Sequence, residues 1–317
     1  MEIVFMGTPK FAVPSLLGLI ESKHNILAVV TQPDRPRGRG KRILQSPVKE
    51  VALQHGIRVL QPERIGEPLY VNQIESLKPD TIVVIAYGQI LPKNILTIPP
   101  KGCINVHASL LPKYRGAAPI NWAIINGEKE TGVTTMYMDE GLDTGDMIYK
   151  SRISIDDHMD AGELHDALSE QGRVLLLKTL ESIEKDQAPR IPQNNSECSH
   201  APMLDKEIGE INWERSAIEI HNLIRGINPW PGAYTFLGNS RMKIWESRII
   251  GGVHDNNKPV CSIVDYKPQM GWIIKTGKGL LAVTTIQMPN GRKMHVDSYI
   301  CGHHVAIGTV LGGSFGK

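Results

Sequence analysis

The first part of the chain alternates short, unbroken apolar runs with segments of helical periodicity, and this alternation limits the fold more than any other feature. The runs are rich in β-branched residues, which is typical of strands buried on both faces of a sheet. They lie at residues 2–6, 26–31, 57–60, 81–86 and 103–107. Because strands that alternate with helices pair in parallel, the sequence predicts a doubly wound, Rossmann-like α/β domain.

Two helices of this domain have clear signals. Ser46 can cap a helix that Pro47 begins and Gly56 follows, and this order of residues is typical of helix ends. A last long helix is expected at residues 161–185, with four leucines on one side. These are Leu164, Leu168, Leu175 and Leu176.

A polar stretch then separates two parts of the chain. Residues 187–195 are rich in Pro, Asn and Gln and have little core-forming content. We therefore predict a first domain over residues 1–187, a linker over 188–207 and a second domain over 208–317.

The second domain is predicted to be mainly β. One amphipathic helix at about residues 216–225 precedes strand-like runs that Gly, Pro and Asn interrupt. This pattern is typical of a small β-barrel. The runs lie at residues 233–237, 242–250, 260–266, 272–276 and 280–287.

Charge is distributed unevenly along the chain. The 317 residues carry a formal net charge of only +2. Residues 209–317 contain twelve Lys and Arg against seven Asp and Glu, an excess of +5, so the preceding residues carry −3. A basic second domain favours an anionic partner.

Cysteine usage and hydropathy limit the compartment. The four cysteines are far apart and match neither a zinc-site spacing nor a disulfide framework. No run approaches the roughly 20 apolar residues that a membrane span needs, and the first residues do not resemble a signal peptide. We expect a soluble cytoplasmic protein with no membrane segment and no metal.

A polar pair ends the fifth apolar run. Asn105 and His107 lie at its carboxyl end, where open α/β sheets bind their ligands. Alternation along a strand points both side chains to one face, about 6.6 Å apart. The pair therefore predicts a site, although a histidine that merely caps a strand is an open alternative.

An acidic loop follows between strand-like residues 132–137 and 147–153. It carries Asp139, Glu140 and Asp143. A carboxylate beside His107 would favour the charged, donating imidazole. The alternatives are a hairpin loop with solvated acids or a calcium-like loop, although the full EF-hand spacing is absent.

Ser109 has no GxSxG elbow to make it a nucleophile. Asn, His and Asp in this arrangement instead favour acyl or one-carbon transfer to an external amine. In such a reaction the enzyme supplies an oxyanion donor and manages protons, without a covalent nucleophile.

A basic run follows the second predicted strand. Five bases in eight residues, spaced by Pro and Gly, predict a mobile finger suited to phosphate contact, and a solvated loop is the alternative. The bases are Arg35, Arg37, Arg39, Lys41 and Arg42.

Several motifs occur together along the chain. Asn105-x-His107-x-Ser109-Leu110-Leu111-Pro112 is followed by Tyr114-Arg115-Gly116 and then by Gly141-Leu142-Asp143-Thr144-Gly145. Further motifs lie at residues 7–11, 32–36, 86–92, 116–120 and 228–232. In this set the chain resembles the 10-formyltetrahydrofolate-dependent formyltransferase family almost from end to end.

The resemblance implies a catalytic trio of Asn105, His107 and Asp143. An amine would attack the formyl carbon directly, Asn105 and protonated His107 would stabilise the oxyanion, and Asp143 would assist proton removal. The co-substrate would be 10-formyltetrahydrofolate, with no metal. Its binding residues would be Ser109, Leu110, Leu111, Pro112, Ala86, Tyr87, Gly88, Gln89, Ile90, Leu91, Asp139 and Glu140, with Ile90 and Leu91 against the pterin faces.

The resemblance also implies the acceptor. The free amine of methionine on an initiator tRNA would be formylated for translation initiation, by a monomer. The basic finger would enter the acceptor arm, with Arg39 foremost, and the second domain would be an OB-like barrel that contacts the outside of the tRNA. The expected barrel contacts are Lys243, Lys275, Lys278, Arg292 and Lys293.

Three alternatives stay open at this point. The first is a formyltransferase that acts on a small amine such as an amino sugar nucleotide, against which the finger and the basic domain argue. The second is an RNA-binding module on an inactive scaffold, and the third is a folate hydrolase or dehydrogenase. Trp213, Trp230 and Trp245 are interpreted as core or domain-interface anchors rather than base-stacking platforms.

Overall fold

The computed structural model describes residues 1–37, 42–251 and 258–312. Contacts divide the chain into two compact units, which we call the first and the second unit. The first unit comprises Met1–Pro119, Glu130–Ser154 and His165–Pro202, and the second comprises Ile120–Lys129, Ile155–Leu164 and Met203–Lys317. Two segments that precede residue 188 therefore pack with the second unit.

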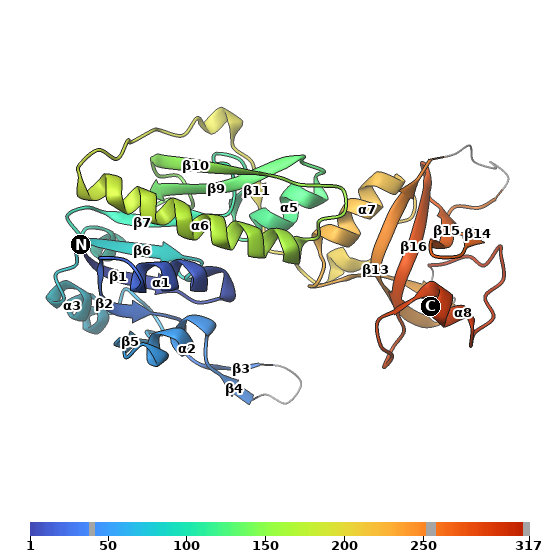
Figure 1. Ribbon diagram of the computed structural model, residues 1–317, viewed down its shortest axis with the longest axis horizontal. Helices are drawn as coiled ribbons and strands as arrows, with labels where there is room; N and C mark the ends of the chain where they lie inside the picture. Colours follow the sequence, from blue (N-terminus) through green and yellow to red (C-terminus); the bar gives the residue numbers. More distant parts are fainter. Residues whose placement is uncertain (38–41, 252–257, 313–317) are drawn as a thin grey trace. The chain divides into compact units, whose positions relative to one another are not determined.

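A seven-stranded sheet forms the centre of the first unit (Figure 1). Five strands pair in parallel, as the apolar runs predict, and the last two run antiparallel to their neighbours. In sheet order they are β5 (Val59–Leu60), β2 (Asn25–Val30), β1 (Glu2–Gly7), β6 (Thr81–Ile85), β7 (Cys103–His107), β9 (Glu130–Tyr137) and β10 (Met147–Ser154). Strand β9 runs antiparallel to β7, with Tyr137 opposite Ile104, so the acidic loop between β9 and β10 leaves the sheet beside the amino half of β7. The loop brings Asp143 back to the side chains of Asn105 and His107.

Helices cover this sheet where the sequence predicts them. Helix α2 (Pro47–Gln54) begins at Ser46, whose hydroxyl accepts a hydrogen bond from the Lys49 amide at 3.0 Å. Helix α6 (Ala161–Glu184) packs on β7 and β9, and the four predicted leucines are buried. The other helices of the first unit are α1 (Val13–Ile20), α3 (Pro68–Ser76) and α4 (Lys93–Leu96), whereas α5 (Pro119–Ile125) belongs to the second unit from Ile120 onward.

The second unit is an antiparallel β domain, as expected. Helix α7 (Ala217–Gly226) begins at Ser216, which forms a capping box with Glu219. Residues 308–312 hydrogen-bond to Ile263 and Cys261 at one edge of the sheet and to Phe236 at the other, which links the two edges as in a barrel. Its elements are β12 (Ala233–Leu237), β13 (Ser240–Ile250), β16 (Leu280–Gln287), β15 (Gly271–Lys275), β14 (Ile263–Lys267), β17 (Met294–His295) and α8 (Val296–Ile300).

The stretch expected to be a linker is partly built into the first unit. Strand β11 (His200–Ala201) pairs in parallel with β8 (Arg115–Gly116), and Ile191 exchanges two backbone hydrogen bonds with Met147 at the start of β10. Residues up to Pro202 belong to this unit. The composition of the stretch does not predict this packing, because the stretch is held by backbone pairing and by hydrogen bonds of side-chain amides rather than by apolar side chains.

Among the described residues, no helix is both long and apolar enough to cross a bilayer.

Candidate active site

The carboxyl end of β7 brings the predicted trio together. The Asn105 Nδ2 atom lies 3.4 Å from Asp143 Oδ1, and His107 Nδ1 lies 3.6 Å from Asp143 Oδ2. All three side chains are largely enclosed, with His107 and Asp143 exposing 7% and 12% of their side-chain surface. Strand alternation places Asn105 and His107 on one face, and the β9–β10 loop supplies the carboxylate.

A backbone carbonyl orients His107. Its Nε2 atom lies 2.9 Å from the Tyr114 carbonyl oxygen. Because a carbonyl only accepts, this contact requires a proton on Nε2 and leaves Nδ1 facing Asp143. A second proton, on Nδ1, would make the ring an imidazolium directly beside the carboxylate.

Asp143 has a third polar neighbour. The Gly116 amide donates to Asp143 Oδ2 at 2.8 Å, so a backbone N–H and the Asn105 amide both point at this carboxylate. Glycine suits position 116, since its φ is +119° and an added Cβ would lie 2.7 Å from the Ala201 carbonyl oxygen. The carboxylate is thus fixed from two sides.

Three non-glycine residues around the trio have left-handed backbone conformations. Their φ angles are +54° at Asp143, +61° at Tyr114 and +47° at Ala86. Such positions cost about 1 to 3 kcal/mol each and concentrate at functional sites. Ala86 follows β6 directly and Asp143 lies in the β9–β10 loop. The unfavourable backbone conformations therefore occur in the connections after strands.

Side chains from β9 and β10 hold the stretch 109–112 that is predicted to bind folate. Thr134 donates to the Ser109 carbonyl at 2.6 Å and accepts from the Leu111 amide at 3.1 Å, while Lys150 donates to the Leu111 carbonyl at 2.5 Å. The Leu111 side chain is fully buried against Met136 and Met147. Ser109 is also fully buried, with its hydroxyl donating to the Lys113 carbonyl at 2.6 Å.

The predicted folate residues after β6 divide by exposure. Ala86, Gly88 and Ile90 are exposed. Tyr87 and Leu91 belong to the core of the first unit, each 2% exposed, so the expected packing of Leu91 on a pterin face is not available to its side chain. The Gln89 side chain bonds to residues 62–65 of the protein itself. It accepts from the Ile65 amide and donates to the carbonyls of Pro62 and Glu63.

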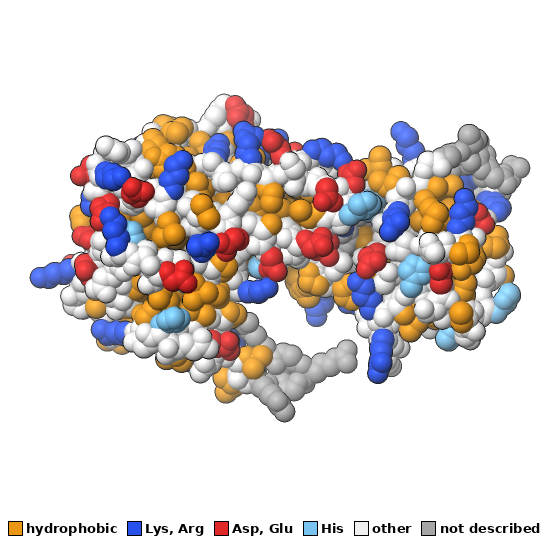
Figure 2. Space-filling view, viewed as in Figure 1, with side chains coloured by type: hydrophobic (Ala, Val, Ile, Leu, Met, Phe, Trp, Pro, Cys, Tyr) orange, Lys and Arg blue, Asp and Glu red, His pale blue; other side chains and the backbone are white. Residues whose placement is uncertain are grey.

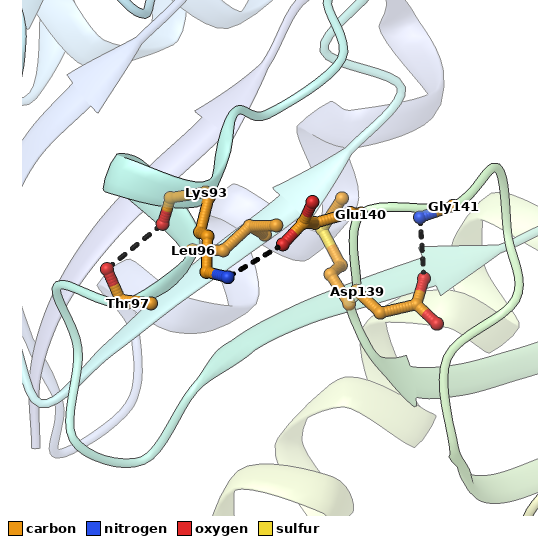
Figure 3. A pocket seen from close by; sticks show the side chains of 7 residues that line it. Lys93, Leu96, Thr97, Asp139, Glu140 and Gly141 are labelled. Atoms are coloured by element: carbon orange, nitrogen blue, oxygen red, sulfur yellow. Dashed lines mark hydrogen bonds and ion pairs between the residues drawn. The ribbon is translucent and has the colours of Figure 1, made fainter.

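The predicted residues Asp139 and Glu140 line an open hollow of about 490 Å³ (Figure 3). Asp139 Oδ1 accepts from the Gly141 amide at 3.0 Å, and Glu140 faces Lys93 at 3.4 Å. The hollow therefore has carboxylate acceptors on one side and a cation on the other. The remaining lining residues are Leu96, Thr97 and Met138.

The basic run has a regular stem. Strands β3 (Arg35–Arg37) and β4 (Arg42–Leu44) pair antiparallel, so the expected mobile finger is a ribbon at its base. Asp34 anchors it, because Lys49 Nζ lies 2.5 Å from Asp34 Oδ2 and Gln61 donates to Oδ1 at 2.9 Å. The predicted contacts Arg39 and Lys41 lie outside the described residues.

Two of the bases predicted to contact tRNA converge in the second unit. The Lys243 and Lys293 ammonium groups each lie 5.4 Å from the centre of the Trp245 ring. Arg241 was not among the bases predicted to contact tRNA. Its guanidinium carbon lies 3.5 Å from the centre of the Tyr234 ring, and it lies two residues before Lys243 on strand β13. Trp245 is half-buried beneath cations, whereas Trp213 is a core residue, 5% exposed.

The remaining predicted bases do not join this cluster. Lys278 and Arg292 are exposed, and Lys275 donates to the Lys258 carbonyl. Basic and acidic side chains are interspersed over the face shown in Figure 2. The aromatic–basic cluster of Lys243, Trp245 and Lys293 is therefore the more specific nucleic-acid candidate in this unit.

Sequence reasoning missed one contact with the β9–β10 loop, which carries the candidate catalytic residue Asp143 and is called the catalytic loop below. The Gln193 amide donates to the carbonyls of Asp143 and Gly145, both at 2.8 Å. No motif marks Gln193, which lies in the stretch interpreted as a linker. Within the described ranges, no group of three or more His, Cys, Asp or Glu side chains is arranged to hold a metal ion.

Comparisons with known proteins agree on one family. The chain matches the family model for formyl transferase over residues 1–180 and the model for the formyl transferase C-terminal domain over residues 203–304. Methionyl-tRNA formyltransferase of Clostridioides difficile is 53% identical and that of Acetivibrio thermocellus 51%. Each alignment covers 98% of this chain and 100% of the relative.

A solved structure has a similar fold. It is an N-formyltransferase from Helicobacter canadensis in complex with folinic acid and dTDP-3-aminofucose, with a TM-score of 0.65. The alignment covers 89% of this chain and 98% of that chain at 22% identity. At this identity the likeness shows the fold alone.

Proposed function

This chain belongs to the formyltransferase family, and we propose that it transfers the formyl group of 10-formyltetrahydrofolate to the free amine of methionyl-initiator-tRNA. The product is formylmethionyl-tRNA for translation initiation. Relatives with this name align over nearly the whole chain at about half identity. The observation that carries the proposal is the convergence of Asn105, His107 and Asp143 at the end of β7.

Each member of the trio has a role that its contacts allow. One N–H of the Asn105 amide points to Asp143, so the second can donate to the oxyanion that forms when the amine attacks the formyl carbon. A protonated His107 presents Nδ1–H beside Asp143 and adds positive charge at the same place. The Asp143 carboxylate can then accept the proton that the attacking amine loses.

Direct attack is consistent with the surroundings of Ser109. This serine is fully buried and its hydroxyl donates to the Lys113 carbonyl, so it is not presented as a nucleophile. The formyl group therefore passes to the amine without an acyl-enzyme. As the new C–N bond forms, the bond between the formyl carbon and the folate nitrogen breaks, and that nitrogen gains a proton.

The residues at the strand ends fit a folate. Exposed Ala86, Gly88 and Ile90 offer main chain and one apolar side chain to a flat heterocycle. In the hollow between α4 and the β9–β10 loop, Asp139 and Glu140 offer acceptors for the N–H groups of a pterin edge. We propose that the co-substrate contacts these groups and the main chain of residues 109–112, while the side chains of Tyr87, Leu91 and Leu111 support the site from the core.

The tRNA contacts are proposed on charge and shape. The sequence between Arg35 and Arg42 contains five bases, and its described ends pair as strands β3 and β4, which suits contact with the phosphates of an acceptor arm. In the second unit, Lys243 and Lys293 beside Trp245 combine cations with an aromatic face.

We propose that the protein acts as a monomer, since one chain carries the complete trio. We also propose that it acts in the cytoplasm.

The acceptor preference tests this function. Purified protein with 10-formyltetrahydrofolate is expected to formylate methionine on initiator tRNA at least about tenfold faster than methionine on elongator tRNA. Both acceptors carry the same amine, so the difference isolates tRNA recognition. Equal rates on the two tRNAs would contradict the proposed specificity for initiator tRNA.

A further inference from the structure

Residues 191–201 contact three parts of the chain around Asp143, namely the start of β10, the β9–β10 loop and strand β8. Ile191 pairs with Met147, which follows the loop. Gln193 bonds to the loop itself, and His200 and Ala201 pair with Arg115 and Gly116. The loop is therefore bonded to a residue that lies 50 positions after Asp143 in the chain.

Both ends of the Gln193 side-chain amide are engaged. Its Nε2 donates to the carbonyl oxygens of Asp143 and Gly145, at 2.8 Å each. Its Oε1 accepts from Arg115 Nε at 3.1 Å and from Arg115 Nη2 at 2.7 Å. Since a guanidinium only donates and a carbonyl only accepts, this arrangement admits one orientation of the amide.

Arg115 connects this contact to the carboxylate. Its side chain is buried, with the residue 5% exposed, and Nη2 also donates to Asn195 Oδ1 at 2.9 Å. The next residue, Gly116, donates its amide to Asp143 Oδ2 at 2.8 Å. Gln193 thus holds the main chain of Asp143, while Gly116, the second residue of strand β8, holds its side chain.

Asp143 needs these contacts because its backbone has a left-handed conformation. Its φ of +54° is unfavourable for a residue with a side chain. Its carboxylate is nevertheless placed at both Asn105 and His107. If the loop relaxed toward an ordinary conformation, the carboxylate would leave both partners.

We propose that Gln193 is a positioning residue of the transfer reaction, which acts with Arg115 to keep Asp143 in its strained, productive conformation. The inference rests on the proposed function, since Asp143 is the proposed proton acceptor. It also assigns a catalytic-support role to the segment 191–201, which otherwise resembles an interdomain connection.

Two substitutions test the inference. Gln193→Glu keeps the length of the side chain and an acceptor for Arg115, but it removes the N–H that donates to the two carbonyls and places a charged oxygen against them. Gln193→Ala removes both interactions. The matched control is Gln187→Ala, at an exposed glutamine that precedes the segment 191–201.

We expect Gln193→Glu to lower kcat by about 100-fold, the effect of a small misplacement of a catalytic group. The KM values for folate and tRNA should stay within about twofold of wild type, because the variant changes no proposed substrate contact. Gln187→Ala should retain wild-type kcat. An unchanged kcat in Gln193→Glu, or a loss of kcat with an equal rise of both KM values, would overturn the positioning role.

An activity-independent readout separates this inference from the proposed function. The imidazole NMR signals of His107, assigned through their loss in His107→Asn, should shift in Gln193→Glu and stay unchanged in Gln187→Ala. Wild-type protein that fails to formylate initiator tRNA would refute the function, while the NMR shift would still decide the positioning. If Gln193→Ala does not fold, Gln193→Glu carries the test, and unshifted His107 signals in that variant would contradict it.

Discussion

Asp143→Ala is expected to lower kcat for formyl transfer by about 1000-fold, within the range that a positioned acid or base contributes. The carboxylate is the shared partner of Asn105, His107 and the Gly116 amide. Without it the imidazolium loses its counter-charge and the attacking amine loses its proton acceptor. Asn105→Ala should have a similar effect, because it removes the amide donor to the oxyanion.

Measuring the affinity for tRNA shows whether a variant loses activity through a lost catalytic group or through a damaged fold. Neither residue lies on the basic ribbon or in the aromatic–basic cluster, so the Kd for initiator tRNA should stay within about twofold of wild type. The control is Asp146→Ala, which removes another acid of the same loop whose only ion pair, among the described residues, is a 3.9 Å contact with Arg190. A parallel loss of tRNA affinity and of Tm would mean that Asp143 and Asn105 are structural residues.

Neutralising Arg37, Arg39 and Lys41 together, each to glutamine, is expected to raise the KM for tRNA and to flatten its salt dependence. Loss of three phosphate contacts should reduce the slope of log K against log salt by about 2 to 3. The KM for 10-formyltetrahydrofolate should not change, because the ribbon carries no proposed folate contact. Binding measured over a range of salt concentrations gives both quantities.

A second triple variant controls for net charge. Lys10, Lys23 and Lys185 are exposed bases of the same unit, with side chains 72%, 67% and 55% accessible. Replacing them with glutamine changes the net charge by the same amount. If both triple variants alter the salt slope equally, the ribbon has no specific role, and an unchanged slope in the ribbon variant would make it a solvated loop.

The sequence predicts the central sheet and the position of Asn105 and His107 at the end of a strand, because both follow from strand patterns. Buried parallel strands need continuous apolar runs, and those runs locate β1, β2, β6 and β7. The carboxyl end of β7 then indicates Asn105 and His107. The strand-like runs of β9 and β10 also indicate one acidic loop between them, but they do not choose among its acids, and Asp143 is indicated by the family resemblance.

Other features of the site depend on contacts that no local pattern encodes. The left-handed turn at Ala86 turns the chain after β6, so that Tyr87 and Leu91 enter the core and Ile90 faces solvent. Gln193 reaches the catalytic loop across about 50 residues through hydrogen bonds alone. Pro and Gly between the bases of residues 35–42 conceal the β3–β4 stem, because these residues usually interrupt strands.

The acceptor class tests the account most directly. The measurement is kcat/KM for formyl transfer from 10-formyltetrahydrofolate to methionyl-initiator-tRNA and to an amino-sugar nucleotide such as dTDP-3-aminofucose. The account predicts that the tRNA value exceeds the sugar value by at least about 1000-fold, because only the tRNA engages the ribbon and the aromatic–basic cluster. A larger value for the amino sugar, or transfer to the sugar alone, would contradict it.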